Sequence, residues 1–239
     1  MILEYGIIII LILIIICTLR TTNYVMNTSN YTEIYKNMTF DRVKLSEIYD
    51  ELKTGDLLFF RSAISSFVVD KLIPTEIYKH VAMIVKLDDE LYCTESTIRD
   101  FFAKDDITNE LYILKSGVNT MLLIPRLQYY SGLIFIHKLN KPISTSDEIK
   151  LIEYINESAS IAYPSSLSLY MNLVFNIKIS NDLYCYEYIY MLLKHINIIT
   201  ENKTNVKDIS NYIANIYKYQ LNDGYKYSEG KQLVYDLIE

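Results

Sequence analysis

Cysteine is scarce in this chain of 239 residues, and three cysteines are too few for a disulfide framework. Cys17 lies in an apolar N-terminal run, and nothing in the sequence requires a disulfide between Cys93 and Cys185. Reduced thiols are therefore the simpler interpretation. No Cys-x-x-Cys pair and no His/Cys cluster has the spacing of zinc ligands, so we expect neither a metal nor another cofactor.

Clusters of basic residues are also lacking. The formal net charge is −6 and no block rich in lysine and arginine is present, which argues against nucleic acid as a main partner. Hydrophobic residues make up 51% of the chain and charged residues 22%. This composition can build a core for one sizeable domain, or at most two small ones.

An uncharged run of mostly isoleucine and leucine extends from residue 6 to residue 19. A helix that spans a bilayer needs roughly 20 apolar residues, and the run approaches this length when residues 1–5 are added. We therefore expect a single-pass membrane anchor over residues 1–21 and a polar stalk over residues 22–45. A cleaved signal peptide is an alternative, but a basic leading segment and a small-x-small cleavage site are lacking. A buried helix of a soluble protein is the remaining alternative.

Glycine and proline are few, with 6 and 4 copies against 23 tyrosines, and isoleucine, asparagine and lysine are abundant. This bias is typical of an AT-rich genome, in which Asn-x-Ser/Thr triplets arise without selection. We interpret the sequons as chance occurrences, although a lumenal body would allow their glycosylation. The side of the membrane stays open, because Arg20 and the later lysines favour a cytosolic body whereas the sequons would suit a lumenal one. The sequons begin at Asn27, Asn30, Asn37, Asn156 and Asn202.

Hydrophobic periodicity over residues 46–239 predicts an α+β domain in which a mostly antiparallel sheet packs on helices. The clearest element is a hairpin, with strands at 80–86 and 90–96 and a turn at Asp88–Asp89. From about residue 200 we expect a helical extension. Other expected elements are a short helix from 46 that ends at a turn over 54–56, a strand at 57–60, a strand pair at 121–125 and 133–139, and helices from 146, at 182–198 and at 207–219.

Glu95, on the second hairpin strand, is the first candidate functional residue. It shares a strand face with apolar neighbours, and a buried carboxylate needs a partner. His80, on the first hairpin strand, is the partner that we expect. A carboxylate bonded to one imidazole nitrogen would fix the tautomer and leave the other nitrogen as a base. The alternative is that His80 is structural, which is the commoner role for a histidine at a strand start.

Cys185, in the segment LYCYEYIYMLL (183–193), is either a core residue or a nucleophile. Residues 180–182 are good N-cap residues, which places Cys185 in the first turn of a helix whose apolar face packs on the sheet. The helix N-terminus and a neighbouring imidazolium would lower the pKa of the thiol, and free amides there could form an oxyanion hole. Each role alone is weak, but together they predict a Cys185–His80–Glu95 triad.

Three other residues fit this chemistry less well. His195 lies ten residues after Cys185 on the same predicted helix, which separates the two by about 15 Å along the axis. His137 lies on a different predicted strand without an acidic neighbour. Cys93 shares a strand face with Glu95 and is the second-choice nucleophile.

Several segments resemble the circularly permuted papain-like hydrolases of the NlpC superfamily. The most similar branch contains bacterial YiiX-type proteins, the lecithin–retinol acyltransferase group and their poxviral relatives, and the resemblance covers about residues 48–200. The specific parts are the His-Val strand start and the Cys-x-Glu-x-x-Tyr segment. The matching segments are GDLLFF (55–60), HVAMIV (80–85), YCTES (92–96), GVNTMLLIPRL (117–127), AYPSS (162–166) and YCYEYIY (184–190).

The resemblance implies a permuted papain-like fold, with Cys185 as nucleophile, His80 as general base and Glu95 as the orienting third residue. This chain departs from the pattern in two places. Tyr186 follows the nucleophile where relatives often have serine, and Ala82 stands where glycine is common. A bulky tyrosine beside the nucleophile puts the shape of the substrate groove in doubt.

The function that we expect is a membrane-anchored cysteine hydrolase or acyltransferase that acts on an amide or ester through a thioester. The family's range and the anchor favour an acyl-lipid or peptide-like substrate. Asp56 and Glu187 also match family positions, and we interpret both as structural. The alternatives are a catalytically silent, membrane-anchored binding or structural protein of virion type, and an unrelated membrane-tethered domain. The AT-rich composition and the poxviral similarity suggest a large DNA virus.

Overall fold

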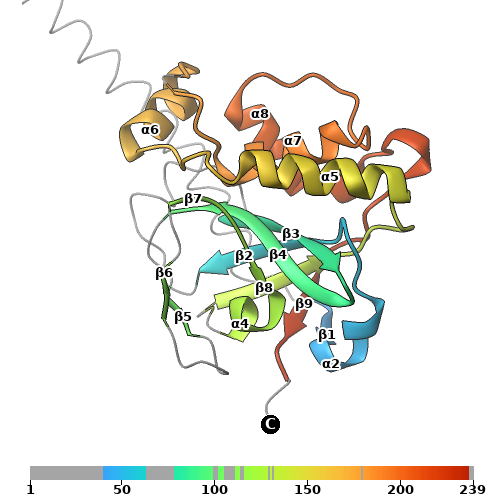
Figure 1. Cartoon of the computed structure of the whole chain (residues 1–239). Helices are drawn as coiled ribbons and strands as arrows, with labels where there is room; N and C mark the ends of the chain where they lie inside the picture. Colours follow the sequence, from blue (N-terminus) through green and yellow to red (C-terminus); the bar gives the residue numbers. More distant parts are fainter. Residues whose placement is uncertain are drawn as a thin grey trace, which may run out of the picture.

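The computed structural model describes residues 40–62, 78–98, 102–104, 111–113, 116–128, 130, 132–178 and 180–236. The expected anchor and the stalk up to residue 39 lie outside these ranges. In the ranges that are described, no helix has the combined length and apolarity that crossing a membrane requires. The described part is an α+β structure built on a seven-stranded sheet (Figure 1).

The strands of the large sheet follow the spatial order β1-β9-β8-β2-β3-β4-β7. Each neighbouring pair is antiparallel except β1 and β9, which are parallel. Strands β5 and β6 form a separate antiparallel ribbon. The bounds are β1 (Arg42–Lys44), β2 (Leu57–Ser62), β3 (His80–Leu87), β4 (Glu90–Thr97), β5 (Phe102–Lys104), β6 (Leu111–Ile113), β7 (Gly117–Leu122), β8 (Gly132–His137) and β9 (Lys231–Val234).

Helices cover both faces of the sheet. In Figure 1, α5, α6, α7 and α8 lie above the sheet, and α2 and α4 lie below it. A hydrophobic core fills the space on each side. The bounds are α2 (Leu45–Ile48), α4 (Leu123–Gln128), α5 (Thr145–Ser158), α6 (Ser166–Phe175), α7 (Cys185–His195) and α8 (Val206–Ala214), with short 3₁₀ turns at Tyr49–Glu51, Ile216–Lys218 and Asn222–Gly224.

The helix α7 is the central element of the larger core. Its buried residues are Cys185, Tyr186, Glu187, Tyr188, Ile189, Tyr190, Leu192 and Leu193. From the sheet, Val81, Met83 and Val85 of β3 belong to the same core, whereas Ala82 and Ile84 belong to the core on the other face. This alternation follows from the two-residue repeat of a strand, and it confirms the predicted hairpin strand.

The hairpin of β3 and β4 forms where it was predicted. Asp88 and Asp89 have φ angles of 48° and 68°, which a tight two-residue hairpin turn requires and aspartate tolerates. The strand pairing next to the turn joins Leu87 to Glu90 and continues along the hairpin. The expected strand at 57–60 is also confirmed and forms most of β2.

The predicted strand pair at 121–125 and 133–139 is wrong in two respects. β7 ends at Leu122 and the chain continues as α4, because Pro125 cannot donate to a ladder but fits the first turn of a helix. In addition, β7 pairs with β4, whereas β8 pairs with β2 and β9. Only the second of the two strands is therefore found near its expected bounds.

The C-terminal segment contains more than helix. The helix expected at 207–219 is present as α8, followed by a 3₁₀ turn. β9 then enters the large sheet between β1 and β8, which the sequence did not indicate. The helix α6 was also not predicted. The domain thus takes its sheet from both ends of the described chain.

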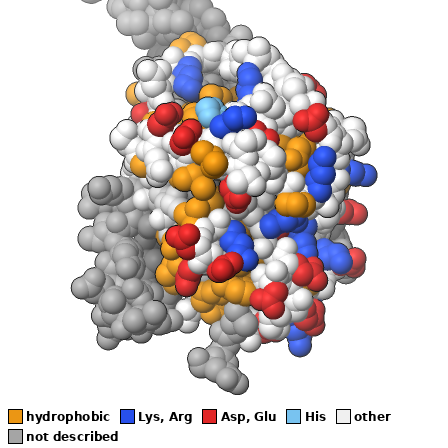
Figure 2. All heavy atoms as spheres, turned by 45° about the vertical axis from the view of Figure 1, so that its right-hand side comes forward, with side chains coloured by type: hydrophobic (Ala, Val, Ile, Leu, Met, Phe, Trp, Pro, Cys, Tyr) orange, Lys and Arg blue, Asp and Glu red, His pale blue; other side chains and the backbone are white. Residues whose placement is uncertain are grey.

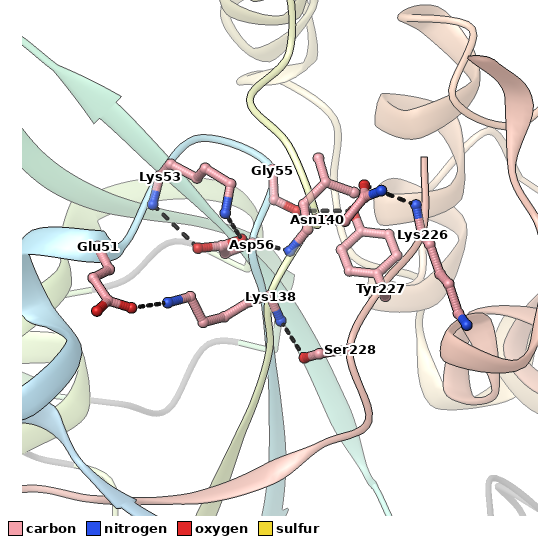
Figure 3. Close-up of polar contacts among 10 residues, drawn as sticks. Glu51, Lys53, Gly55, Asp56, Lys138, Asn140, Lys226, Tyr227 and Ser228 are labelled. Carbon is pink, nitrogen blue, oxygen red and sulfur yellow. Dashed lines mark hydrogen bonds and ion pairs between the residues drawn. The ribbon is translucent and has the colours of Figure 1, made fainter. Parts of the chain in front are cut away.

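The turn before β2 is tied to two later segments through Gly55 and Asp56 (Figure 3). Its carboxylate accepts hydrogen bonds from the backbone N–H of Lys53 at 3.1 Å and of Leu139 at 2.7 Å. The Tyr227 hydroxyl donates to the Gly55 carbonyl at 2.8 Å. Because Asp56 is fully buried, its hydrogen bonds fix the turn to the end of β8, in agreement with a structural role.

Acidic and basic side chains are interspersed over the face of the molecule in Figure 2, with small apolar areas between them. On this face neither sign forms the extended field that steers a polyanion. The large hydrophobic side chains that are exposed belong to several elements and loops: Ile98, Leu122, Leu133, Ile149, Leu167, Ile177, Met191 and Tyr219.

Candidate active site

His80 and Glu95 are in direct contact. The Nε2 atom of His80, at the start of β3, lies 2.7 Å from Oε2 of Glu95 near the end of β4. Both side chains project from the sheet face that also carries Ala82 and Cys93, as strand alternation predicts. The expected contact is therefore confirmed, and a catalytic role for the pair stays a prediction.

Arg126 completes this pair and was not foreseen. Its Nε donates to Glu95 Oε1 at 2.9 Å and its Nη2 donates to Oε2 at 3.1 Å, a bidentate contact. Arg126 lies in α4, almost fully buried, with its guanidinium 4.5 Å from the centre of the Phe60 ring. The sequence signal was the single charge within LIPRLQ, because a buried arginine requires an acidic partner.

The charge of Glu95 follows from this environment. Burial opposes ionisation, but Arg126 and His80 outweigh it and lower the pKa of the carboxyl from 4.5 to about 2. An ionised carboxylate can only accept hydrogen bonds, so His80 Nε2 carries the hydrogen that it donates to Glu95. In the neutral imidazole Nδ1 then holds the lone pair. The pair thus has the tautomer that a general base needs.

The sheet divides beside this pair. The β3–β4 ladder ends at Met83 and Thr94, although both strands continue beyond it. The first residues of β3 pair only with β2, where His80 lies opposite Phe60. The last residues of β4 pair with β7. The backbone of β3 near Val81 therefore has no ladder partner on β4, and it interacts with the thiol of Cys185 instead.

Two contacts hold the N-terminus of α7 over this division of the sheet. The Ser96 hydroxyl of β4 donates to the Leu183 carbonyl at 2.6 Å. The Tyr186 hydroxyl donates to the Tyr78 carbonyl, just before β3, at 2.8 Å. Cys185 is the first residue of α7, as the prediction of a first-turn cysteine requires.

The N-cap of α7 differs from the expected one. Tyr184 occupies the N-cap position, and the Glu187 carboxylate accepts a hydrogen bond from the Tyr184 N–H at 3.1 Å. The expected cap residues 180–182 precede the helix, where Ser180 donates to Asp182 at 2.6 Å. Glu187 thus stabilises the helix start, in agreement with a structural role.

The Cys185 thiol is 1% exposed, and burial raises its pKa to about 12. Interactions with the Tyr184 side chain and with the Val81 and Tyr186 backbone favour the thiolate, but burial outweighs them. The expected lowering of the thiol pKa is therefore not found. The resting protein holds a neutral thiol, and any reaction must remove its proton as the new bond forms.

The thiol and the imidazole lie on different sides of the sheet. Cys185 packs in the core that contains Val81, whereas His80 lies with Glu95 on the opposite face. Among the described residues, the Tyr184 hydroxyl and the backbone of Val81 and Tyr186 interact with the thiol, and no hydrogen bond joins it to His80. The structure thus joins His80 to Glu95 and does not place the imidazole in hydrogen-bond contact with the thiol.

The other candidates have structural surroundings. His137 is fully buried, with Nδ1 lying 3.0 Å from the Ser228 carbonyl, and burial lowers its pKa to about 4. His195 stacks on Tyr154 with ring centres 4.7 Å apart. Cys93 lies in the core on the His80 face, where burial raises its pKa well above the ordinary value. Cys93 and Cys185 are both free thiols.

Possible metal ligands do not cluster in the part of the chain that the structure covers. No three His, Cys, Asp or Glu side chains are grouped there in a way that could hold an ion. Glu95 is already engaged by Arg126 and His80, so its lone pairs serve the ion pair and the hydrogen bonds.

Comparisons with known proteins give similarity to solved structures at a distant level. No protein-family model matches the chain, and no curated protein matches it. Among solved structures, the chain is similar to the metalloprotein yiiX from Escherichia coli O157:H7 (DUF1105), with a TM-score of 0.39 and 16% identity. The match covers 60% of this chain and 66% of that chain, just under two thirds of its length. Similarity at this level transfers neither activity nor metal.

Proposed function

We propose that the chain is a thiol-dependent hydrolase or acyltransferase that acts on an amide or ester bond. The observation that carries the proposal is the buried Arg126–Glu95–His80 chain beside the strand segment that contacts the Cys185 thiol. Each member has a chemical task in acyl transfer. We further propose that the fold is a permuted papain-like one of the NlpC superfamily, in its YiiX-like and acyltransferase-like branch, and that the source is viral.

In the proposed first step, His80 takes the thiol proton at Nδ1 while Sγ of Cys185 bonds to the carbonyl carbon. The carbonyl π electrons move to oxygen and form a tetrahedral adduct. The adduct then collapses as the C–N or C–O bond to the leaving group breaks, and the leaving group receives the proton from His80. A thioester on Cys185 remains.

In the second step, water or another nucleophile gives a proton to His80 and attacks the thioester. The C–S bond breaks, and Cys185 regains its proton. Glu95 stays ionised throughout, because Arg126 holds its pKa at about 2 even though burial opposes ionisation. Its negative charge stabilises the imidazolium that forms in both steps. The high thiol pKa makes proton removal by His80 part of the attack, instead of a separate ionisation.

We also propose that residues 1–21 anchor the domain to a membrane. The support is the uncharged isoleucine- and leucine-rich run at 6–19. A tethered domain meets substrates at a bilayer surface, which favours an acyl-lipid or a lipidated, peptide-like amide or ester.

The direct test is capture of the acyl-enzyme. The full chain, held in detergent micelles, would be incubated with p-nitrophenyl acetate, and the acetylated residue identified by peptide mass spectrometry. We expect acetyl-Cys185 in the parent and in Cys93→Ser. We expect its formation to slow by roughly 10²- to 10⁴-fold in His80→Ala, because the general base is lost. Absence of acetyl-Cys185, or equal rates in parent and His80→Ala, would contradict the proposal.

The burial of the thiol favours a second candidate, a catalytically silent binding or structural protein that retains this arrangement. A fully buried cysteine with a raised pKa is the usual state of a core cysteine. In that case the ion pair of Arg126 and Glu95 would serve packing alone. The same experiment separates the two, since a silent protein forms no His80-dependent acyl-cysteine.

A further inference from the structure

The hydroxyl of Tyr184 is an anomaly of the α7 N-terminus. Tyr184 is fully buried, and its hydroxyl oxygen has no hydrogen bond of regular geometry in the described structure. Neighbouring tyrosines on the helix satisfy theirs: Tyr186 donates to the Tyr78 carbonyl at 2.8 Å and Tyr188 bonds the Thr94 hydroxyl at 2.8 Å. Buried hydroxyls are normally paired, so an unpaired one asks for a functional explanation.

The unpaired hydroxyl lies against the reacting atom of the proposed mechanism. Tyr184 immediately precedes Cys185, and its hydroxyl interacts with the thiol, a weak hydrogen-bond partner. Its ring packs against Tyr163 and Tyr186, with ring centres 5.9 Å and 5.7 Å away. The ring is thus held in place, and the donor it carries is positioned before any substrate arrives.

We infer that the Tyr184 hydroxyl is the oxyanion donor of the acyl-transfer reaction, an inference that rests on the proposed function. When Cys185 Sγ bonds to a carbonyl carbon, the carbonyl oxygen becomes negatively charged. This oxygen and the sulfur are bonded to the same carbon and so lie close together. A hydroxyl that touches Sγ is within reach of this oxygen. The O–H donates to the oxyanion and keeps its own proton, so the step needs no further reactant. A fixed donor in a dry site stabilises such charge strongly.

The test compares Tyr184→Phe with Tyr186→Phe in the full chain in detergent micelles. Both variants lose one buried hydroxyl and keep the ring. Two reactions of Cys185 are followed by mass spectrometry: acetylation by p-nitrophenyl acetate, which passes through an oxyanion, and alkylation by iodoacetamide, which does not. Both reactions need a deprotonated and accessible thiol. A substitution that changes only ionisation or access therefore leaves the ratio of the acetylation rate to the alkylation rate unchanged.

We expect Tyr184→Phe to slow acetylation by roughly 100-fold and to change alkylation far less. In Tyr186→Phe we expect acetylation and alkylation to change by the same factor. The melting temperature of Tyr184→Phe should stay close to that of the parent, because the hydroxyl it lacks interacts only with the thiol, a weak partner. A lower melting temperature together with equal losses in both reactions would assign Tyr184 a structural role and overturn the inference.

Two outcomes separate this inference from the proposed function. If the parent forms no acetyl-Cys185, the proposed function fails and Tyr184 loses its role with it. If the parent is acetylated and Tyr184→Phe is acetylated at the same rate, the proposed function stands and only the Tyr184 assignment is wrong.

Discussion

At the residue scale, burial decides the charge of the groups in the two cores. Burial raises the pKa of Cys185 to about 12 and lowers that of His137 to about 4, which keeps both neutral. Glu95 is the exception, because Arg126 and His80 overcome burial and lower its pKa to about 2. A neutral thiol, together with an ionised carboxylate that holds the imidazole in its base tautomer, is a resting state suited to concerted proton transfer.

His137 should make the protein sensitive to acid. Its pKa is lowered from 6.5 to about 4 in the folded protein, so the unfolded chain binds the proton first as the pH falls. The stability it contributes is complete above pH 6.5 and is lost as the pH falls toward 4. The loss is up to about 3 kcal/mol. Urea unfolding between pH 6.5 and pH 4 checks this. We expect the unfolding free energy of His137→Phe to fall less over this range than that of the parent.

The control for this prediction is His195→Gln, which replaces an exposed residue in the last turn of α7. As the pH falls, the unfolding free energy of this variant should decrease as much as that of the parent. Parallel curves for the parent and His137→Phe would show that His137 is not the group that titrates.

Part of the site could be predicted at this scale. Strand alternation and the need of a buried carboxylate for a partner were sufficient to pair His80 with Glu95. Arg126 was missed because the residues directly before it, 121–125, were assigned to a strand, whereas Pro125 lies in the first turn of a helix. The thiol pKa was predicted with the wrong direction, because the depth of burial at a helix N-terminus depends on segments far apart in the chain.

At the scale of the elements, two short contacts determine how α7 meets the sheet. Ser96 of β4 and the Tyr78 carbonyl before β3 both bond the N-terminal end of α7. They lie on either side of the division between the strands, where the ladder stops at Met83 and Thr94. The helix and the hairpin could each be predicted from their own periodicity. The division could not, because it depends on which partners β3 and β4 have on their outer sides.

Asp56 should contribute more to the stability of the protein than Glu51, an exposed acidic residue nearby. In Asp56→Ala the buried N–H groups of Lys53 and Leu139 lose their acceptor. We expect urea unfolding to show a loss of roughly 2–4 kcal/mol. The matched control is Glu51→Ala, which removes the exposed ion pair with Lys138 seen beside it in Figure 3 and should change stability little. Equal effects of the two substitutions would contradict the role given to Asp56.

At the scale of the whole molecule, the sheet brings together segments that are distant in sequence. β1 and β9 are parallel neighbours from opposite ends of the described chain, and β9 also pairs with β8. The α+β class was predictable from strands followed by helices. The place of β9 between β1 and β8 was not, because its four residues (KQLV) carry too little pattern to indicate their partners.

The central claim is that His80 removes the proton of Cys185 during acyl transfer, and the pH dependence of the acetylation rate tests it most directly. A buried thiol with a pKa of about 12 and no base would react faster by tenfold for each pH unit up to that value. We predict that the parent rate levels off far below this pH, because an imidazole and not hydroxide takes the proton. In His80→Ala the log-linear rise should return. A parent rate that rises log-linearly alongside that of His80→Ala would contradict the account.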